Sequence, residues 1–125
     1  GAELELIGVD DWRAARRLEG HGYDLARAVR DRRSDRTSVL LSHQPKAIDD
    51  AADEGIDLVL SGHTHGGQIW PFNFVVALVQ PYVKGLHQHT ERTWIYVHCG
   101  TGYWGPPLRL GVQSEIASIR LVAAN

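Results

Sequence analysis

Residues 37–61, TSVLLSHQPKAIDDAADEGIDLVLS, decide the fold of this chain. The β-branched and apolar run through Leu41 predicts a strand that is covered on both faces. The next segment opens with Pro45, carries apolar residues on one face and closes at Gly55, which predicts a short helix. Residues 56–62, IDLVLSG, predict a second buried strand. Strand, helix and strand together form a βαβ unit, whose two strands lie parallel and are joined by a right-handed crossover.

The flanking segments extend this unit in both directions. Residues 4–9 predict a short first strand, and residues 24–33, DLARAVRDRR, predict a helix. Apolar runs predict three later strands, at 74–79 (FVVALV), 93–100 (TWIYVHCG) and 115–124 (EIASIRLVAA). We therefore expect one α/β unit, with a sheet that is parallel in its first half and mixed or antiparallel in its second.

Composition excludes several classes of protein. Thirteen basic and fifteen acidic residues give a net charge of −2, which provides no electrostatic case for a nucleic-acid partner. The single cysteine, Cys99, excludes an internal disulfide framework and is expected to be a buried thiol. The chain contains neither a run of the roughly 18 apolar residues that a membrane span needs nor the pattern of a signal peptide. These observations do not indicate the cellular compartment of the protein.

Both strands of the βαβ unit end in histidine. His43 follows the first strand, and His63 and His65 follow the second. Ligands of open α/β sheets bind outside the carboxyl ends of the strands, so we expect three imidazoles to meet at one edge. Imidazole is a common ligand of zinc, iron and other transition metals. An extended His-x-His would project both rings to one side, and Gly62, Gly66 and Gly67 would let the backbone turn tightly around an ion. The sequence thus predicts a metal site.

Other polar residues are weaker candidates. His87 and His89 are expected to be ordinary surface or core residues. No carboxylate is expected beside the three histidines, because Asp49 lies on the predicted helix and Asp57 lies at the far end of a strand. Three histidines taken alone suggest a single open zinc site with one bound water.

Longer strings of residues resemble a known family. LLSHQP (40–45) and DLVLSGHTHGGQIWPF (57–72) resemble the last two metal-binding motifs of the calcineurin-like metallophosphoesterases. YVHCGTGYWGPPLRLG (96–111) and SEIASIRL (114–121) are similar to the carboxy-terminal end of a bacterial branch of that family, whose members often carry membrane anchors or export signals. The resemblance begins at about Val39 and covers most of the chain from there.

The resemblance implies a fold, a metal centre and an activity. The fold is a four-layer αββα sandwich, and the activity is hydrolysis of phosphomonoesters or phosphodiesters. Two divalent ions, of manganese, iron or zinc, hold a hydroxide between them. His43 and His63 correspond to ligands of one ion, and His65 corresponds to a ligand of the other.

The earlier motifs of this family are absent from the chain. They are an Asp-x-His, a Gly-Asp and a Gly-Asn-His followed by an acidic residue, and none occurs in residues 1–125. We therefore expect these residues to be the carboxy-terminal portion of a single domain, with the missing amino-terminal portion as its partner. The chain alone is expected to be inactive, and the parent protein is expected to be membrane-associated or exported.

Three alternatives stay open. Arg109 is a candidate for binding the phosphate of the substrate, and a surface ion pair is the other interpretation. Residues 70–82, WPFNFVVALVQPY, form either a core strand or an apolar lip that contacts a lipid or membrane surface. The rival to the hydrolase is a non-catalytic, protein-binding scaffold of the same fold, because a fold alone does not determine function.

Overall fold

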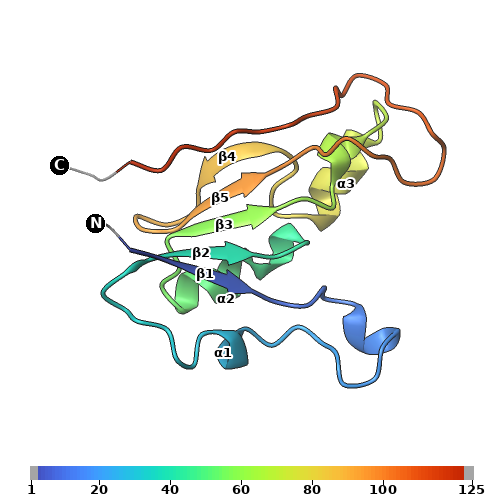
Figure 1. The fold of residues 1–125 in the computed structure, drawn as a ribbon. Coiled ribbons are helices and arrows are strands. Elements are labelled where there is room, and N and C mark those ends of the chain that lie inside the picture. Colours follow the sequence, from blue (N-terminus) through green and yellow to red (C-terminus); the bar gives the residue numbers. More distant parts are fainter. Residues whose placement is uncertain (1–2, 123–125) are drawn as a thin grey trace.

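A computed structural model describes residues 3–122, which are organised around a five-stranded sheet with the order β1-β2-β3-β5-β4 (Figure 1). The strands are β1 (Leu4–Gly8), β2 (Thr37–Leu41), β3 (Leu58–Ser61), β4 (Gly85–Gln88) and β5 (Trp94–Val97). Strands β1, β2, β3 and β5 run parallel to one another, whereas β4 pairs antiparallel with β5. The predicted α/β class with a mixed sheet is confirmed.

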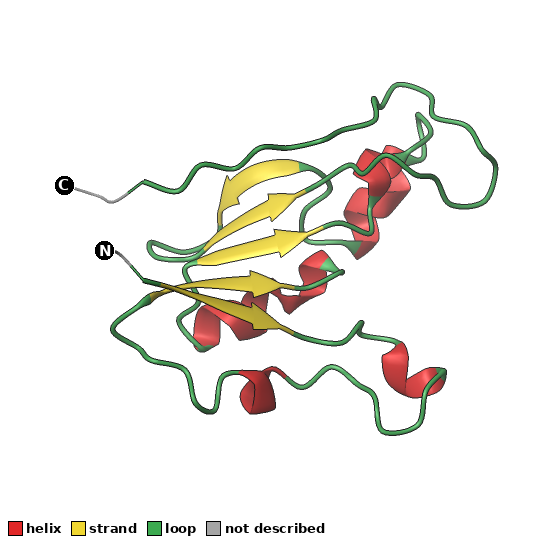
Figure 2. Cartoon of the chain, viewed as in Figure 1, coloured by secondary structure: helices red, strands yellow, loops and turns green. Residues whose placement is uncertain are grey.

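Short helical segments connect the strands. They lie along one side of the sheet and beyond the carboxyl ends of its parallel strands (Figure 2). In chain order they are η1 (Ala14–Arg16), α1 (Leu25–Ala28), η2 (Pro45–Ala47), α2 (Ile48–Asp53), η3 (His65–Gly67) and α3 (Asn73–Val79). The βαβ unit predicted for residues 37–61 is therefore β2, the helical segment of η2 and α2, and β3.

The core lies between the sheet and α2. Leu40, Val59 and Ile95 are aligned across three parallel strands, so their side chains leave the sheet on the same face. Each is fully buried, as is Ile48 on α2. Burying side chains of this size contributes about 1.5–3 kcal/mol each to the free energy of folding. This packing holds the carboxyl ends of β2 and β3 together.

The opposite face of the sheet is apolar and partly exposed. Leu6, Val39, Leu58 and Trp94 are aligned along one row of that face. Leu6 is 65% exposed and Trp94 is 39% exposed. An apolar sheet face of this kind normally packs against another layer. The four-layer sandwich expected from the resemblance is not tested by these residues and stays a prediction.

Residues 74–79 are a helix, and the prediction of a core strand there is wrong. They belong to α3, where Val76 N donates to Phe72 O and Gln80 N donates to Val76 O. Leu78 is 85% exposed and Phe74 is 63% exposed, so most of this helix lies outside the core. A short apolar run does not distinguish a strand from a helix by its period, which explains the error.

Two further segments differ from the prediction. The helix expected over 24–33 is limited to α1, which Asp24 caps by accepting a hydrogen bond from Arg27 N. The segment 115–122 carries no strand, and its Ile116 side chain is 91% exposed. Residues 123 and 124 of that expected strand lie outside the described residues. Strand β4, which the sequence did not predict, forms the sheet edge next to β5.

Candidate functional site

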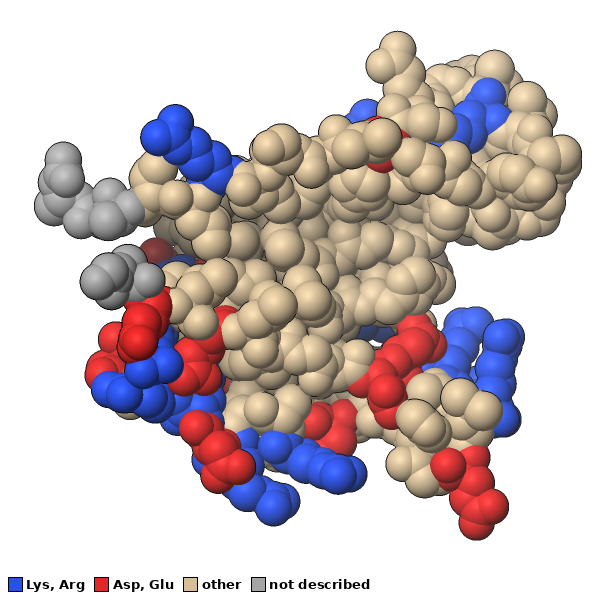
Figure 3. Space-filling view, viewed as in Figure 1, with Lys and Arg blue, Asp and Glu red and all other residues tan. Residues whose placement is uncertain are grey.

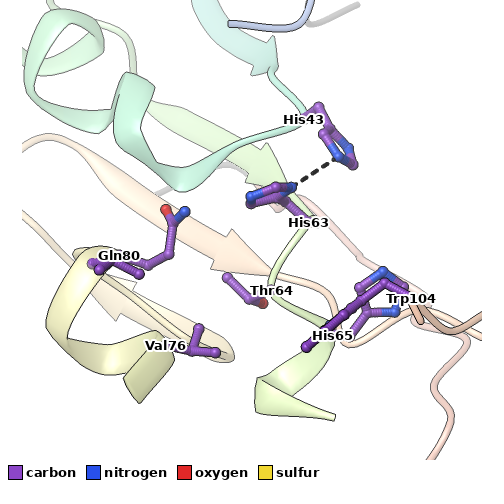
Figure 4. A pocket seen from close by; sticks show the side chains of 8 residues that line it. His43, His63, Thr64, His65, Val76, Gln80 and Trp104 are labelled. Carbon is purple, nitrogen blue, oxygen red and sulfur yellow. Dashed lines mark hydrogen bonds between the residues drawn. The ribbon is translucent and has the colours of Figure 1, made fainter. Parts of the chain in front are cut away.

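The two strands of the βαβ unit deliver their histidines to the same place. His43 is the second residue after β2, and His63 is the second residue after β3. The Nε2 atom of His43 lies 3.2 Å from the Nδ1 atom of His63, and the rings meet edge to face (Figure 4). Gly62 N also donates to His43 O at 3.1 Å, which ties the two strand ends together. Parallel pairing therefore determines this contact.

The backbone between His63 and His65 is turned, and the expected extended His-x-His is wrong. Both histidines have positive φ angles, 66° and 52°, a region that residues other than glycine seldom adopt. Thr64 stabilises the turn, because its hydroxyl donates to Val83 O at 2.6 Å and accepts from Gly66 N at 3.3 Å. The turn directs His63 toward His43 and carries His65 to a separate position (Figure 4).

His65 lies against the loop that follows β5. Its Nδ1 atom is 3.3 Å from the Nη2 atom of Arg109. The guanidinium of Arg109 donates to the carbonyl oxygens of Cys99 at 2.9 Å and of Gly100 at 3.1 Å, and its Nε donates to Gly102 O at 3.0 Å. In this structure Arg109 thus organises its own loop beside His65, and phosphate binding by Arg109 stays a prediction.

The glycine pair after His65 permits close packing. A Cβ atom on Gly66 would lie 2.7 Å from Val112 Cγ1 and 2.8 Å from Cys99 Sγ, and one on Gly67 would overlap Asn73. Cys99 is buried and unpaired, as predicted. The glycines therefore serve contacts between η3 and neighbouring segments, in addition to the tight turn itself.

Gln68 was missed by the sequence analysis. Its side chain is fully buried, with Oε1 accepting from Trp104 N at 2.8 Å and Nε2 donating to Trp104 O at 2.8 Å. This double contact holds Trp104 against a cavity of about 350 Å³ that is also lined by His43, His63 and His65. A glutamine inside a Gly-Gly-Gln string carries no signal of this role, because its partner is 36 residues away.

Asp11 was also missed, and the expectation of no carboxylate beside the histidines is wrong. Asp11 lines an adjoining cavity together with His43 and His63. Its carboxylate accepts from Arg13 N at 2.8 Å and from Gln44 Nε2 at 3.3 Å. Asp11 follows β1, which is parallel to β2, so the rule that located the histidines could have found it. Burial raises the pKa of Asp11, but these two hydrogen bonds and the nearby imidazoles lower it more.

The remaining candidates lie elsewhere. Asp57 accepts hydrogen bonds from Ser38 N and from Arg92 Nε, both at 2.8 Å, at the amino end of β3. His89 contacts Asp49, with 3.2 Å between Nε2 and Oδ1. Neither group lines the cavities beside His43 and His63.

The environment favours neutral imidazoles at the site. Burial lowers the pKa of His63, and the neighbouring His43 lowers it further. Burial also lowers the pKa of His65, with a smaller contribution from the positive charge of Arg109. A neutral imidazole has a free nitrogen lone pair, which is the form that binds a metal ion.

The contact between His43 and His63 fits a shared ion. Two nitrogen ligands at ordinary zinc distances and a tetrahedral angle are about 3.3 Å apart, close to the 3.2 Å between these atoms. Among residues 3–122, no three His, Cys, Asp or Glu side chains form a group that could hold a metal. Ligation by His43, His63 and His65 therefore stays a prediction.

Curated proteins similar to this chain are named as metallophosphoesterases or as carrying a metallophosphoesterase domain. An uncharacterized metallophosphoesterase of Helicobacter pylori strain J99 is 47% identical over 123 residues, which are 98% of this chain and 33% of that protein. This chain is a relative of the metallophosphoesterases. An uncharacterized metallophosphoesterase of Bacillus subtilis is 36% identical over 131 residues, covering all of this chain and 43% of that relative.

A bovine metallophosphoesterase relative has a more specific name. It is called a transmembrane protein with metallophosphoesterase domain, and is 46% identical over 95% of this chain and 28% of its own length. Within residues 3–122 of the present chain, no helix has the length and apolarity to cross a membrane. The chain spans about a third of the length of the first relatives it matches. No family model and no solved structure matches it.

Proposed function

We propose that this chain forms part of a metal-dependent hydrolase of phosphomonoesters or phosphodiesters. The observation that carries the proposal is the 3.2 Å approach of His43 Nε2 to His63 Nδ1 at two adjacent strand ends, in a chain related to metallophosphoesterases. In the proposal these two nitrogens bind one divalent ion, and His65 binds a second. The ions would be manganese, iron or zinc, because imidazole suits several transition metals.

The side chains of this region have distinct roles in the proposed reaction. When bound, the ions supply an activated water and neutralise charge on the phosphoryl oxygens. His43 and His63 hold their nitrogens in place because β2 and β3 fix their backbones. Arg109 holds the loop after β5 beside His65 through the carbonyl oxygens of Cys99 and Gly100. Gln68 holds Trp104 as one wall of the substrate cavity. Arg109 is also retained as a candidate phosphate ligand.

We further propose that the residues form the carboxy-terminal portion of one metallophosphoesterase domain. Two observations support this: the partly exposed apolar face of the sheet, and a length of about a third of the related proteins. The amino-terminal portion would cover that face and supply carboxylate ligands. On this proposal the 125-residue chain alone binds at most one ion weakly and does not hydrolyse phosphoesters.

A hydrolysis assay tests both parts. The complete protein and the 125-residue chain would be incubated with Mn²⁺, Fe²⁺ or Zn²⁺ and either 4-nitrophenyl phosphate or bis(4-nitrophenyl) phosphate. We expect metal-dependent turnover by the complete protein only, and its loss in His63→Ala. Robust turnover by the chain alone would refute the fragment proposal. No metal-dependent turnover by the complete protein would refute the hydrolase and favour the non-catalytic scaffold.

A contact of α3 with a lipid or membrane surface is a second proposal. It is supported by the exposure of Phe74, Leu78 and Val79, at 63%, 85% and 60%, beside a cavity lined by the histidines. Apolar side chains on a short exposed helix can enter the interface of a bilayer. Vesicle co-sedimentation should decrease in Leu78→Asp relative to the parent protein. Equal sedimentation of the two would contradict this contact.

A further inference from the structure

The pair formed by His43 and His63 separates two cavities of different character. The first, of about 350 Å³, is lined on its far side by Val76, Val79 and Trp104. The second, of about 470 Å³, is lined by Arg13 and Arg17 as well as by the two histidines. A group bound at the histidines would therefore have uncharged walls on one side and two guanidinium groups on the other.

The two arginines belong to the turn around η1. Basic and acidic side chains lie side by side over this part of the molecule at the lower right of the space-filling view, whereas the surface over α3 is mostly uncharged (Figure 3). Among residues 3–122, the side chains of Arg13 and Arg17 take part in no ion pair or hydrogen bond. Other arginines, such as Arg33 and Arg92, pair with Asp35 and Asp57.

The acidic residue of the second cavity is already occupied. Asp11 accepts hydrogen bonds from Arg13 N through Oδ1 and from Gln44 Nε2 through Oδ2. Its bond to Arg13 involves the backbone and leaves the guanidinium available. The cavity thus contains two guanidinium groups and only one carboxylate. Guanidinium groups bind phosphate oxygens through two parallel N–H donors.

We propose that Arg13 and Arg17 bind a second phosphoryl group of the substrate while the reacting phosphoester lies at His43 and His63. This inference rests on the proposed hydrolase function and names its substrate class. The substrate would be a phosphoester that carries another phosphoryl group beside the reacting one, as an organic diphosphate does. The arginines would contribute affinity and selectivity and would take no part in bond cleavage.

Binding of inorganic pyrophosphate tests the inference apart from catalysis. The complete protein would be titrated by calorimetry with inorganic pyrophosphate and, separately, with inorganic phosphate, in buffer that contains EDTA. We expect pyrophosphate to bind more tightly than phosphate. Arg13→Ala and Arg17→Ala should each weaken pyrophosphate binding at least about tenfold, the equivalent of one charge-assisted hydrogen bond. Arg13→Lys should retain part of the affinity, because lysine keeps the positive charge but lacks the two parallel N–H donors of the guanidinium.

Arg16 provides a matched control. It lies on the same turn and has the same charge, but it does not line the second cavity. Arg16→Ala should change pyrophosphate binding less than about twofold, because Arg16 does not line the cavity and its exposed charge is screened. Equal effects of the three alanine variants, or no pyrophosphate binding by the parent protein, would overturn the inference. The assay with 4-nitrophenyl phosphate separately reports failure of the hydrolase proposal, since binding in EDTA requires no turnover.

Discussion

Replacing either histidine of the contacting pair should sharply weaken metal binding. With 3.2 Å between His43 Nε2 and His63 Nδ1, both nitrogens are placed to bind one ion. Structural sites with four ligands bind zinc with a free energy of about 10–16 kcal/mol, so each ligand contributes roughly 3 kcal/mol to that binding free energy. His63→Ala or His43→Ala should therefore raise the dissociation constant about 100-fold.

A double-mutant cycle makes the prediction more specific. If both nitrogens bind one ion, removal of the first ligand already disrupts the site, and the double variant should lose less than the sum of the single losses. Zinc binding to the complete protein would be measured by calorimetry at pH 7, with circular dichroism used to verify that each variant is folded. Independent sites would instead give additive losses.

His87 supplies the control histidine. It lies on β4, where its Nε2 atom contacts Lys84 O at 2.7 Å, and it does not line either cavity beside the histidine pair. His87→Ala should bind zinc like the parent chain. If His63→Ala and His43→Ala also bind like the parent, or if the cycle is additive, the shared-ion interpretation is refuted.

Four further outcomes follow from the hydrogen bonds and the packing. Asp57→Ala should lower the free energy of unfolding by roughly 2 kcal/mol, because it leaves the buried Ser38 N–H unpaired. Burial raises the pKa of Asp57, but hydrogen bonds from Arg92 and Ser38 lower it below its usual value. In urea titrations the stabilisation from Asp57 should therefore be complete above the ordinary carboxyl pKa and disappear as pH falls through the lower folded-state pKa. Gly67→Ala should destabilise the chain by more than 1 kcal/mol, since a positive φ and the overlap with Asn73 both oppose a Cβ; an unchanged midpoint of thermal unfolding would contradict this. The 125-residue chain should self-associate in size-exclusion chromatography through its exposed apolar sheet face, and a well-behaved monomer would count against the proposal that another layer covers it.

Local sequence was sufficient for the elements that carry the contacting pair. The segment from Thr37 to Ser61 forms a strand, a helix and a strand. Their lengths, with a proline at the start of the helical segment and a glycine after its end, are compatible with a single arrangement, the right-handed βαβ crossover. Parallel pairing of two strands brings their carboxyl ends to one edge, so the approach of His43 to His63 follows from connectivity. The same reasoning would have located Asp11, had it been applied to the end of β1.

For apolar runs without a clear period, the choice between strand and helix depended on the rest of the molecule. The residues of α3 have the composition of a buried strand, yet they form an exposed helix, because strand and helix are equally compatible with a short apolar string. The extended His-x-His geometry was wrong for a related reason. The turn at His65 depends on a hydrogen bond from the Thr64 hydroxyl to the carbonyl oxygen of Val83, which is distant in sequence.

The sequence by itself determined the α/β class, the βαβ unit and the residues that end its strands, because these depend on short-range patterns and on the handedness of one crossover. Only the tertiary structure decided that Gln68 holds Trp104, that Arg109 lies against His65 and that Arg13 and Arg17 share a cavity with the histidine pair. Each of these relations joins side chains from segments far apart in the chain. Their positions are set by packing, which no local pattern encodes.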